Sequence, residues 1–350
     1  MPAHLHPVHC IVPPHMIEAI LLRGNQQQRR MAARLGEKSA TARSRRQAAV
    51  PEGGYLTAAA PRRKRPRRET YDAKRKDVLP GTLARNEGGA AVADRTVNEA
   101  HDGAGDTYEL YRAVYGRDSL DGRGMQLVST VHFDVDFNNA FWNGSQMVYG
   151  DGDGQVFLPL TRSLSVIAHE LSHGVVQFSG GLVYQDQAGA LNESFADVFG
   201  VLTVQYKKKQ EAADAAWLVG DGILGPKVEG AALRSLKAPG TAYDDDLLGQ
   251  DPQPYHMDDY VQTAGDNGGV HINSGIPNHA FYLLAQFLGG FAWEKAGRIW
   301  YDALQEIDSP HATFAQWADQ TIQSARKLFE ARSLEELFTR RAWRLVGIAL

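Results

Sequence analysis

The stretch SLSVIAHELSHGVVQF, residues 163–178, carries the clearest structural pattern of the chain. Its apolar residues recur three and four positions apart, which predicts a helix with one buried face; they are Leu164, Ile167, Ala168, Leu171, Val175 and Phe178. His169 and His173 are four positions apart and therefore share a helix face. They can bind one metal ion while Glu170 leans toward its open coordination position. HxxxH also occurs by chance on ordinary helices. The residues that follow must therefore distinguish a metal site from an ordinary buried helix.

A second helical pattern, GALNESFADVFGVL at residues 189–202, supplies a third metal ligand. Glu193 in this segment adds a carboxylate to the two imidazoles. Three protein ligands leave the fourth tetrahedral position for water, which is typical of a catalytic zinc site and not of a closed structural one. Asp197 is four residues further on the same face, where it can accept the remaining N–H of a ligating histidine. We expect one zinc ion here.

Four segments in order make the chain resemble the thermolysin-like zinc metalloproteases over roughly residues 71–350. They are NNAFWNGSQMVYGDGDGQVF, HELSHGVVQ, GLVYQDQAGALNESFADVFG and DNGGVHINSGI. Zinc aminopeptidases with the same HExxH helix resemble the chain less, because their glutamate is one residue nearer the second histidine and a GAMEN-like run is missing here. The resemblance therefore favours an endopeptidase.

This resemblance implies a role for several side chains in peptide hydrolysis. Glu170 matches the general base that takes a proton from the zinc-bound water and later delivers it to the leaving amine. Tyr184 and His271 match the groups that stabilise the oxyanion. Asp266 matches the carboxylate that keeps His271 protonated. A lone tyrosine or histidine is otherwise an ordinary core residue, so these roles depend on the family register.

The resemblance also implies how an extended peptide would bind. Asn139 and the backbone of Ala140 match an edge strand that pairs with substrate, and such pairing carries little sequence preference. Arg234 matches the residue that holds the substrate backbone on the leaving-group side. The residues that match the pocket wall beyond the scissile bond are apolar: Phe157, Leu160, Val166 and Leu233. We expect cleavage on the amino side of Leu, Phe or Ile, with shallow specificity.

The family's double calcium site is expected to be absent. At the positions that correspond to its carboxylates the chain has Ser165, Val204, Ala216 and Leu218. A calcium ion needs oxygen ligands, and three of these four side chains offer none. The run DGDG, residues 151–154, resembles a calcium loop, but in this family it is a turn beside the cleft.

The fold class expected is α+β, with two thermolysin-like lobes and the zinc helix between them. Residues 71–165 contain short Val, Phe and Tyr segments broken by Gly and Asn, which predicts a strand-rich lobe. Four segments after Ile276 have helical apolar spacing and predict a helical C-terminal lobe. The predicted divisions are a propeptide at 1–50, a basic linker at 51–70, an N-terminal lobe at 71–178 and a C-terminal lobe at 179–350. Four tryptophans are expected as core anchors: Trp293, Trp300, Trp317 and Trp343.

The N-terminal segment differs from the rest in charge. Residues 1–80 hold 17 Lys and Arg against 6 Asp and Glu, a net charge of +11. Because the whole chain has a net charge of −4, residues 81–350 carry a net charge of −15. This difference favours docking of the segment on the body, although a solvated tail would have the same composition. The run IVPPHMIEAILLRG, residues 11–24, resembles the PPxM-type propeptide of protealysin-like enzymes, which implies a zymogen inhibited by its own propeptide. The chain's one cysteine, Cys10, is a candidate to cap the zinc in the precursor; an incidental thiol is the alternative.

Composition limits the other partners and the cell compartment. RRKRPRR, from Arg62 to Arg68, could bind phosphate, but aromatic stacking residues are missing nearby, so a labile linker is preferred over nucleic-acid binding. No apolar run is long enough to span a bilayer, and no ordinary signal peptide is evident. We expect a monomer that acts on peptides and proteins, with a proteinaceous inhibitor as a further candidate partner. Family resemblance implies secretion, and a cytoplasmic precursor is the alternative.

Overall fold

The computed structural model describes residues 9–36 and 66–350. Most of the predicted linker at 51–70, including the greater part of the basic run from Arg62 to Arg68, lies outside the described residues. The first strand of the catalytic body already begins at Arg68, inside the range predicted as linker.

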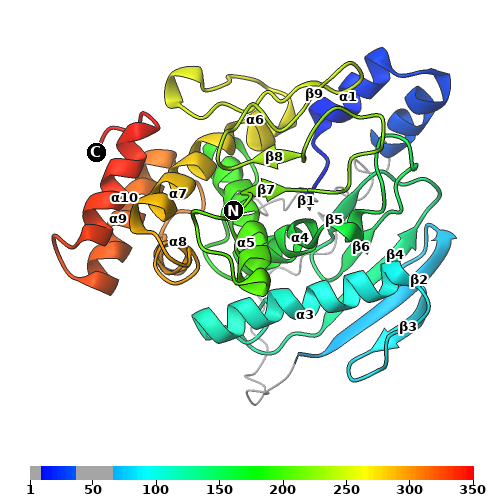
Figure 1. The fold of residues 1–350 in the computed structure, drawn as a ribbon, viewed down its shortest axis with the longest axis horizontal. Coiled ribbons are helices and arrows are strands. Elements are labelled where there is room, and N and C mark those ends of the chain that lie inside the picture. Colours follow the sequence, from blue (N-terminus) through cyan, green and yellow to red (C-terminus); the bar gives the residue numbers. More distant parts are fainter. Residues whose placement is uncertain (1–8, 37–65) are drawn as a thin grey trace, which may run out of the picture.

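A mixed sheet forms the first half of the body (Figure 1). Its strands are β1 (His9–Cys10), β2 (Arg68–Lys76), β3 (Thr82–Asn86), β4 (Leu127–Phe133), β5 (Ala140–Trp142) and β6 (Met147–Tyr149). Within the described residues these strands have the order β1-β5-β6-β4-β2-β3. Pairs β2–β4 and β4–β6 are parallel, and the others are antiparallel. The prediction of strands in this region is confirmed.

One long helix in this lobe was not predicted. Helix α3 (Arg95–Tyr115) crosses beneath the sheet and packs against α4 (Leu164–Gln177) (Figure 1). Asp94 caps it by accepting hydrogen bonds from the backbone N–H groups of Thr96 and Val97. Its sequence contains two glycines and many polar residues, which weaken the helical pattern. Burial of one face against α4 stabilises the helix, and that contact is visible only in the tertiary structure.

The second half of the body is helical, as predicted. Helix α4 packs along α5 (Asp186–Lys208) at the centre of the molecule, between the sheet and the C-terminal helices (Figure 1). Those helices are α6 (Asp266–Asn273), α7 (Gly275–Leu288), α8 (Ala296–Glu306), α9 (Phe314–Phe329) and α10 (Leu334–Leu345). The four tryptophans expected in the core are buried there. The α+β architecture with the HELSH helix between two lobes is therefore confirmed.

Short elements connect these parts. They are the 3-10 turns η1 (Leu160–Arg162) and η2 (Met257–Asp259) and the strands β7 (Leu218–Val219), β8 (Arg234–Ser235), β9 (Asp244–Asp245) and β10 (Gly249–Gln250). In the described part of the chain, no helix combines the length and the apolar character that a membrane span requires.

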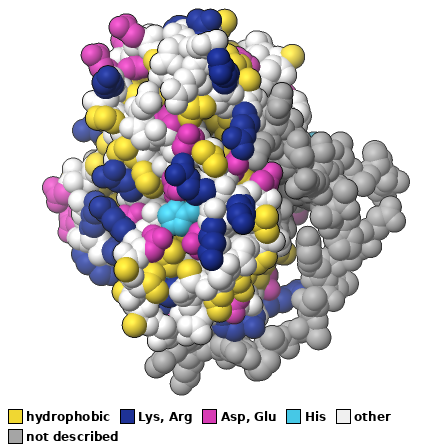
Figure 2. Space-filling view, turned by 90° about the vertical axis from the view of Figure 1, so that its right-hand side faces the viewer, with side chains coloured by type: hydrophobic (Ala, Val, Ile, Leu, Met, Phe, Trp, Pro, Cys, Tyr) yellow, Lys and Arg dark blue, Asp and Glu magenta, His cyan; other side chains and the backbone are white. Residues whose placement is uncertain are grey.

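The N-terminal segment lies on the body as an extended strand followed by helices. Strand β1 adds to the sheet beside β5, and α1 (Pro14–Arg23) follows at once, with Pro14 at its first position. Residues 26–36 form another helical stretch. Arg34 there forms an ion pair of 2.5 Å with Asp134 of the body. Figure 2 shows basic and acidic side chains interspersed over the described part of one face.

A histidine between two carboxylates joins α3 to the DGDG turn. In β4, His132 Nδ1 lies 2.8 Å from Asp151 Oδ1, and Nε2 lies 2.8 Å from Asp94 Oδ2. The hydrogen bond to Asp151, helped by Asp94, raises the pKa of His132 to about 9 against the opposing effect of burial. The imidazolium can donate to both carboxylates at neutral pH and so connects the α3 N-cap with the turn.

This contact predicts a pH-dependent stability. Because the pKa of His132 is raised on folding, its contribution is fully present below pH about 6.5 and is lost as the pH rises through about 9. In a Glu170→Ala background that prevents self-digestion, the melting temperature should fall more steeply between pH 7 and 10 in the parent than in His132→Gln. The exposed His311 provides the control substitution His311→Gln. Parallel pH profiles for the parent and His132→Gln would contradict this role.

Candidate active site

Three buried side chains from α4 and α5 meet at one point. Among the described residues, the side chains that together could hold a metal ion are His169, His173 and Glu193, with ligand atoms within 4.8 Å of one another. The two Nε2 atoms are 3.0 Å apart, and the Glu193 oxygens lie 3.5 Å from His169 Nε2 and 3.4 Å from His173 Nε2. A tetrahedral zinc ion with ligands at about 2.1 Å separates them by about 3.4 Å. The spacing therefore fits one zinc ion.

The outer polar contacts of the imidazoles indicate that this point suits a cation. His173 Nδ1 lies 2.9 Å from Asn192 Oδ1, and His169 Nδ1 lies 2.8 Å from Asp197 Oδ1. Both partners are acceptors, so both Nδ1 atoms carry the proton and both Nε2 atoms present lone pairs. Two lone pairs and a carboxylate would face each other at close range in a buried site. A metal ion turns this repulsion into three bonds, so the donor set fits zinc.

Glu170 is fixed beside β5, the strand of the sheet that pairs with β1. Its Oε2 accepts a hydrogen bond of 3.0 Å from the backbone N–H of Trp142 in β5. The side chain is fully buried, and it extends from the same helix as the two histidines. The carboxylate is thus placed between the metal-binding group and the strand that would hold a peptide.

Asp197 connects the metal-binding group to a buried cation. Besides His169, it contacts Arg234 of β8 through Nη2 at 2.8 Å and Nε at 2.9 Å. Burial alone would raise the pKa of Asp197, but Arg234 and His169 hold that pKa well below its ordinary value. Asn278 also donates to this carboxylate. Asp197 therefore stays ionised, which fixes the orientation of His169 and of the Arg234 guanidinium.

A turn at the start of α6 carries His271 to the opposite side of the cleft. Gly268 and Gly269 have φ of 85° and 76°, and a Cβ at Gly268 would meet Asp186 Oδ1 at 2.1 Å, so a side chain is excluded here. His271 Nδ1 lies 2.7 Å from Asp266 Oδ1. Burial would lower the pKa of His271, but Asp266 and then Glu193 raise it to about 9. Its imidazolium can therefore donate from Nε2 into the cleft.

Tyr184 is directed at the same place. Its hydroxyl lies 3.1 Å from His271 Nε2 and donates a short hydrogen bond to Glu193. Burial, followed by the charge of Glu193, raises the pKa of Tyr184 well above its ordinary value, so the hydroxyl keeps its proton. The structure thus brings Tyr184, His271 and the metal-binding group together at one end of α5.

The cleft is filled by the N-terminal segment. The backbone N–H of Ile11 donates to Ala140 O at 3.2 Å, and Val12 N–H donates to Asn139 Oδ1 at 3.0 Å. Arg234 Nη1 donates to Ile11 O at 3.1 Å. The residues expected to bind a substrate backbone are thus engaged by residues 11 and 12 of the same chain.

The residues expected to form the apolar pocket are all buried, and so is Cys10. Phe157, Leu160, Val166 and Leu233 are at most 1% exposed. Cys10 is 7 % exposed, and its carbonyl oxygen lies 3.1 Å from His271 Nε2. Contact of its thiol with zinc stays a prediction.

Two contacts of the site were not predicted from the sequence. Asn192, adjacent to Glu193, holds His173 Nδ1, and its position beside a ligand could have suggested this role. The backbone N–H of Trp142 anchors Glu170, and a main-chain donor leaves no signal in sequence. Predicting which residues of the N-terminal segment enter the cleft also required the tertiary structure.

The fold and this site define a metallopeptidase, and comparisons with known proteins agree. Residues 47–177 match the model of the thermolysin metallopeptidase catalytic domain, and residues 180–348 match that of its α-helical domain. The chain belongs to the thermolysin family of metallopeptidases. The ligand group His169, His173 and Glu193 matches the zinc dependence of that family.

Relatives resemble the chain over different lengths. An extracellular metalloprotease from Pectobacterium carotovorum subsp. carotovorum is 44% identical over 98% of this chain and 97% of its own length. Thermolysin from Alicyclobacillus acidocaldarius subsp. acidocaldarius is 40% identical over 80% of this chain but only 50% of its own length. The solved structure of the precursor of protealysin from Serratia proteamaculans has a TM-score of 0.88 at 44% identity, covering 97% of this chain and 100% of that one. The similarity to that precursor includes the N-terminal segment, so the chain is a peptidase with its propeptide attached.

The role of Asn192 can be tested through metal affinity. Asn192→Leu removes the acceptor that orients His173, so zinc affinity should fall about 10- to 100-fold. Asn192→Asp keeps an acceptor oxygen at that position and should stay near the parent value. Competition with a chelator of known affinity measures both variants. Equal zinc affinity in the leucine variant and the parent would rule out this orienting role.

Proposed function

We propose that this protein is the zymogen of a zinc endopeptidase that cleaves on the amino side of bulky hydrophobic residues, with Glu170 as general base. The observation that carries the proposal is the convergence of a three-ligand metal group, a buried carboxylate and an imidazolium donor around one extended peptide strand.

Each part of the reaction has a side chain in place. A zinc ion held by the three ligands would polarise water and lower its pKa to about 7. Glu170, oriented by Trp142, takes the proton of the attacking water and delivers it to the leaving amine. His271, protonated through Asp266, donates to the carbonyl oxygen as it becomes negative. The Tyr184 hydroxyl, which donates to Glu193 in this structure, would exchange that partner for the same oxygen.

Substrate preference follows from the apolar pocket and from strand pairing. A peptide beside β5 is held by its backbone through Asn139, Ala140 and Arg234, which contributes affinity without much selectivity. Selectivity then comes from the side chain after the scissile bond, which enters the pocket formed by Phe157, Leu160, Val166 and Leu233. An apolar pocket favours Leu, Phe and Ile and disfavours charge, because a buried charge without a partner is strongly destabilised.

Latency follows from the N-terminal segment. A substrate cannot bind while residues 9–12 occupy the edge strand and Arg234. We therefore assign residues 1–50 as the propeptide and 51–70 as the linker whose cleavage separates it, with 71–178 and 179–350 as the catalytic lobes. In this precursor Cys10 is the candidate to cap the zinc.

Independence from calcium is part of the proposal. At Ser165, where the family's calcium site has a carboxylate, the hydroxyl accepts from Gly220 N–H at 3.0 Å and lies 2.8 Å from Ser163 Oγ. These hydrogen bonds, together with that from Ser163 Oγ to Asp221, tie the start of α4 to the turn at Asp221. Secretion is supported by the extracellular metalloprotease among the relatives.

The general base and the pocket can be tested together. On a peptide library, the matured enzyme should cleave mainly before Leu, Phe and Ile. Glu170→Ala should retain zinc by elemental analysis but lose about 10²- to 10⁴-fold in kcat, because proton transfer is no longer assisted. Because Glu170→Ala is not expected to remove its own propeptide, this variant is activated in trans by a small amount of parent enzyme. Cleavage mainly beside charged residues would contradict the proposed pocket specificity. Full activity of Glu170→Ala would contradict the proposed general base.

Metal add-back tests the ion. After EDTA treatment, zinc alone should restore peptidase activity, and calcium alone should not. The melting temperature should also stay unchanged when calcium is added to the zinc form. Recovery with calcium alone would contradict both the zinc assignment and the absent double calcium site.

A further inference from the structure

The peptide bond between Cys10 and Ile11 lies where the proposed machinery would cut. On its acyl side, the Cys10 carbonyl oxygen is 3.1 Å from His271 Nε2. On its amine side, the Ile11 N–H donates to Ala140 O at 3.2 Å, and the next carbonyl accepts from Arg234 at 3.1 Å. Donors to the carbonyl and groups that hold the leaving-group backbone thus flank this single bond.

The side chain after the bond also has the required character. Ile11 is fully buried in the hydrophobic core of the molecule. Val12 is held by Asn139 through both its N–H and its carbonyl, at 3.0 Å and 3.4 Å. A bulky aliphatic residue therefore follows the bond, as the proposed specificity demands, and the backbone contacts of Ile11 and Val12 fix the direction of the strand.

Glu170 is placed next to this strand. Its carboxylate accepts from Trp142 N–H, and Trp142 is the β5 partner of His9, one residue before Cys10. The proposed base is therefore anchored to β5, the strand with which residues 9–11 pair.

We infer that the zymogen hydrolyses its own Cys10–Ile11 bond in cis, in the state in which the Cys10 thiol does not cap the zinc. The inference rests on the proposed function. Water oxygen bonds to the Cys10 carbonyl carbon, the C–N bond to Ile11 breaks, and a proton passes through Glu170 to the Ile11 nitrogen. The products are a segment that ends in the Cys10 carboxylate and a chain that begins with the Ile11 ammonium group.

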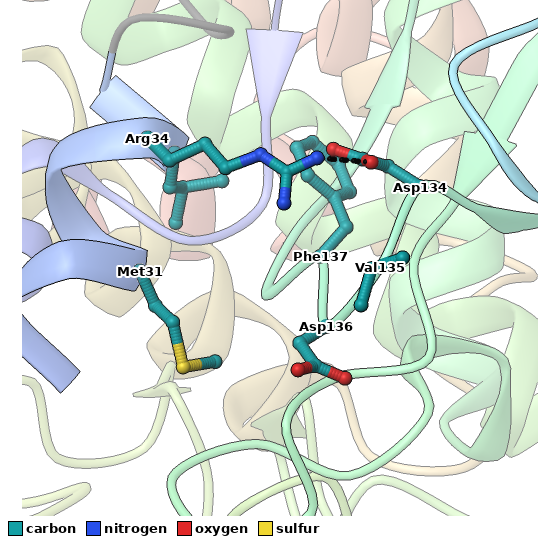
Figure 3. A pocket seen from close by; sticks show the side chains of 7 residues that line it. Met31, Arg34, Asp134, Val135, Asp136 and Phe137 are labelled. Carbon is teal, nitrogen blue, oxygen red and sulfur yellow. Dashed lines mark hydrogen bonds and ion pairs between the residues drawn. The ribbon is translucent and has the colours of Figure 1, made fainter. Parts of the chain in front are cut away.

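This cut does not by itself release the propeptide. Residues 11–36 remain anchored by α1, where Met16 and Ile20 are buried against the body. Figure 3 shows a second anchor, in which Arg34 extends to Asp134 across a cavity of about 50 Å³ that Met31 and Phe137 also line. Cleavage at Cys10–Ile11 is thus a first step that removes the strand β1 contacts and precedes loss of the helices.

The self-cleavage is measured on the full chain supplied with zinc. Intact-mass spectrometry and N-terminal sequencing should show a new terminus at Ile11, forming at a rate that is independent of protein concentration. In ¹⁸O-labelled water, the Cys10 carboxylate should gain one labelled oxygen. Glu170→Ala should leave the bond intact. A rate that increases with protein concentration, or cleavage in Glu170→Ala, would overturn the inference.

Matched variants test the position of Ile11. Ile11→Leu should be cut at a similar rate, and Ile11→Asp at least tenfold more slowly, because a charge cannot enter the apolar pocket. Leu22→Ala, at a side chain that is 75% exposed, is the neutral control. Equal rates for the aspartate and leucine variants would show that the pocket does not select this bond.

A second readout does not depend on activity. Cys10 is the single cysteine and is 7% exposed, so its reaction with a thiol reagent reports whether the strand is docked. In the Glu170→Ala background, Ile11→Asp should speed this reaction at least tenfold, and Ile11→Leu should not. Unchanged thiol protection in Ile11→Asp would contradict docking through the pocket.

The outcomes separate this inference from the proposed function. If the matured enzyme cleaves the peptide library but Cys10–Ile11 stays intact in the zymogen, the inference fails and the function stands. If neither occurs, the proposed function itself fails. If Cys10→Ala is cut and the parent is not, the thiol blocks hydrolysis, and the inference is wrong for the natural chain.

Discussion

The close packing of α4 against α5 is the constraint on which the rest of the structure depends. Gly200 permits it, because a Cβ there would lie 2.7 Å from Ser165 O. With the helices this close, His169, His173 and Glu193 meet in a buried site. Asn192 and Asp197 contact the Nδ1 atoms of the two histidines, so the Nε2 lone pairs of both point toward the shared site. Buried groups arranged in this way are stable only around a cation. The metal site and the helix pair therefore stabilise each other.

From this centre, buried polar contacts extend in two directions. Asp197 accepts hydrogen bonds from two nitrogens of Arg234. The third nitrogen of this guanidinium, Nη1, donates to a peptide carbonyl. In the same way, Asp266 holds Nδ1 of His271, whose Nε2 faces the cleft. Each donor is held by a carboxylate behind it, so it need not reorganise when negative charge develops in front. The N-terminal segment uses this prepared surface, which explains how a short stretch of backbone can block the cleft.

The sequence predicted the metal group because three ligands and one orienting carboxylate are on two strongly periodic helices. Local periodicity places side chains on a face without any tertiary information. The C-terminal helices and the four buried tryptophans were predicted for the same reason. Helix α3 was missed because its glycines and polar residues hide its buried face, and the His132 contact was missed because it joins Asp94, His132 and Asp151 from three separate segments.

By itself, the sequence determined the chemistry of this protein: HELSH, Glu193 and Asp197 require a metal and a base on adjoining helices. It also indicated a propeptide through its charge and its Pro-Pro motif. Only the tertiary structure decided which peptide bond of that propeptide faces the site. Periodicity fixes the side chains within a helix, but the register of one extended strand on another depends on which backbone groups pair and which side chain the pocket accepts. Here Ala140, Asn139 and Arg234 set that register at Ile11 and Val12.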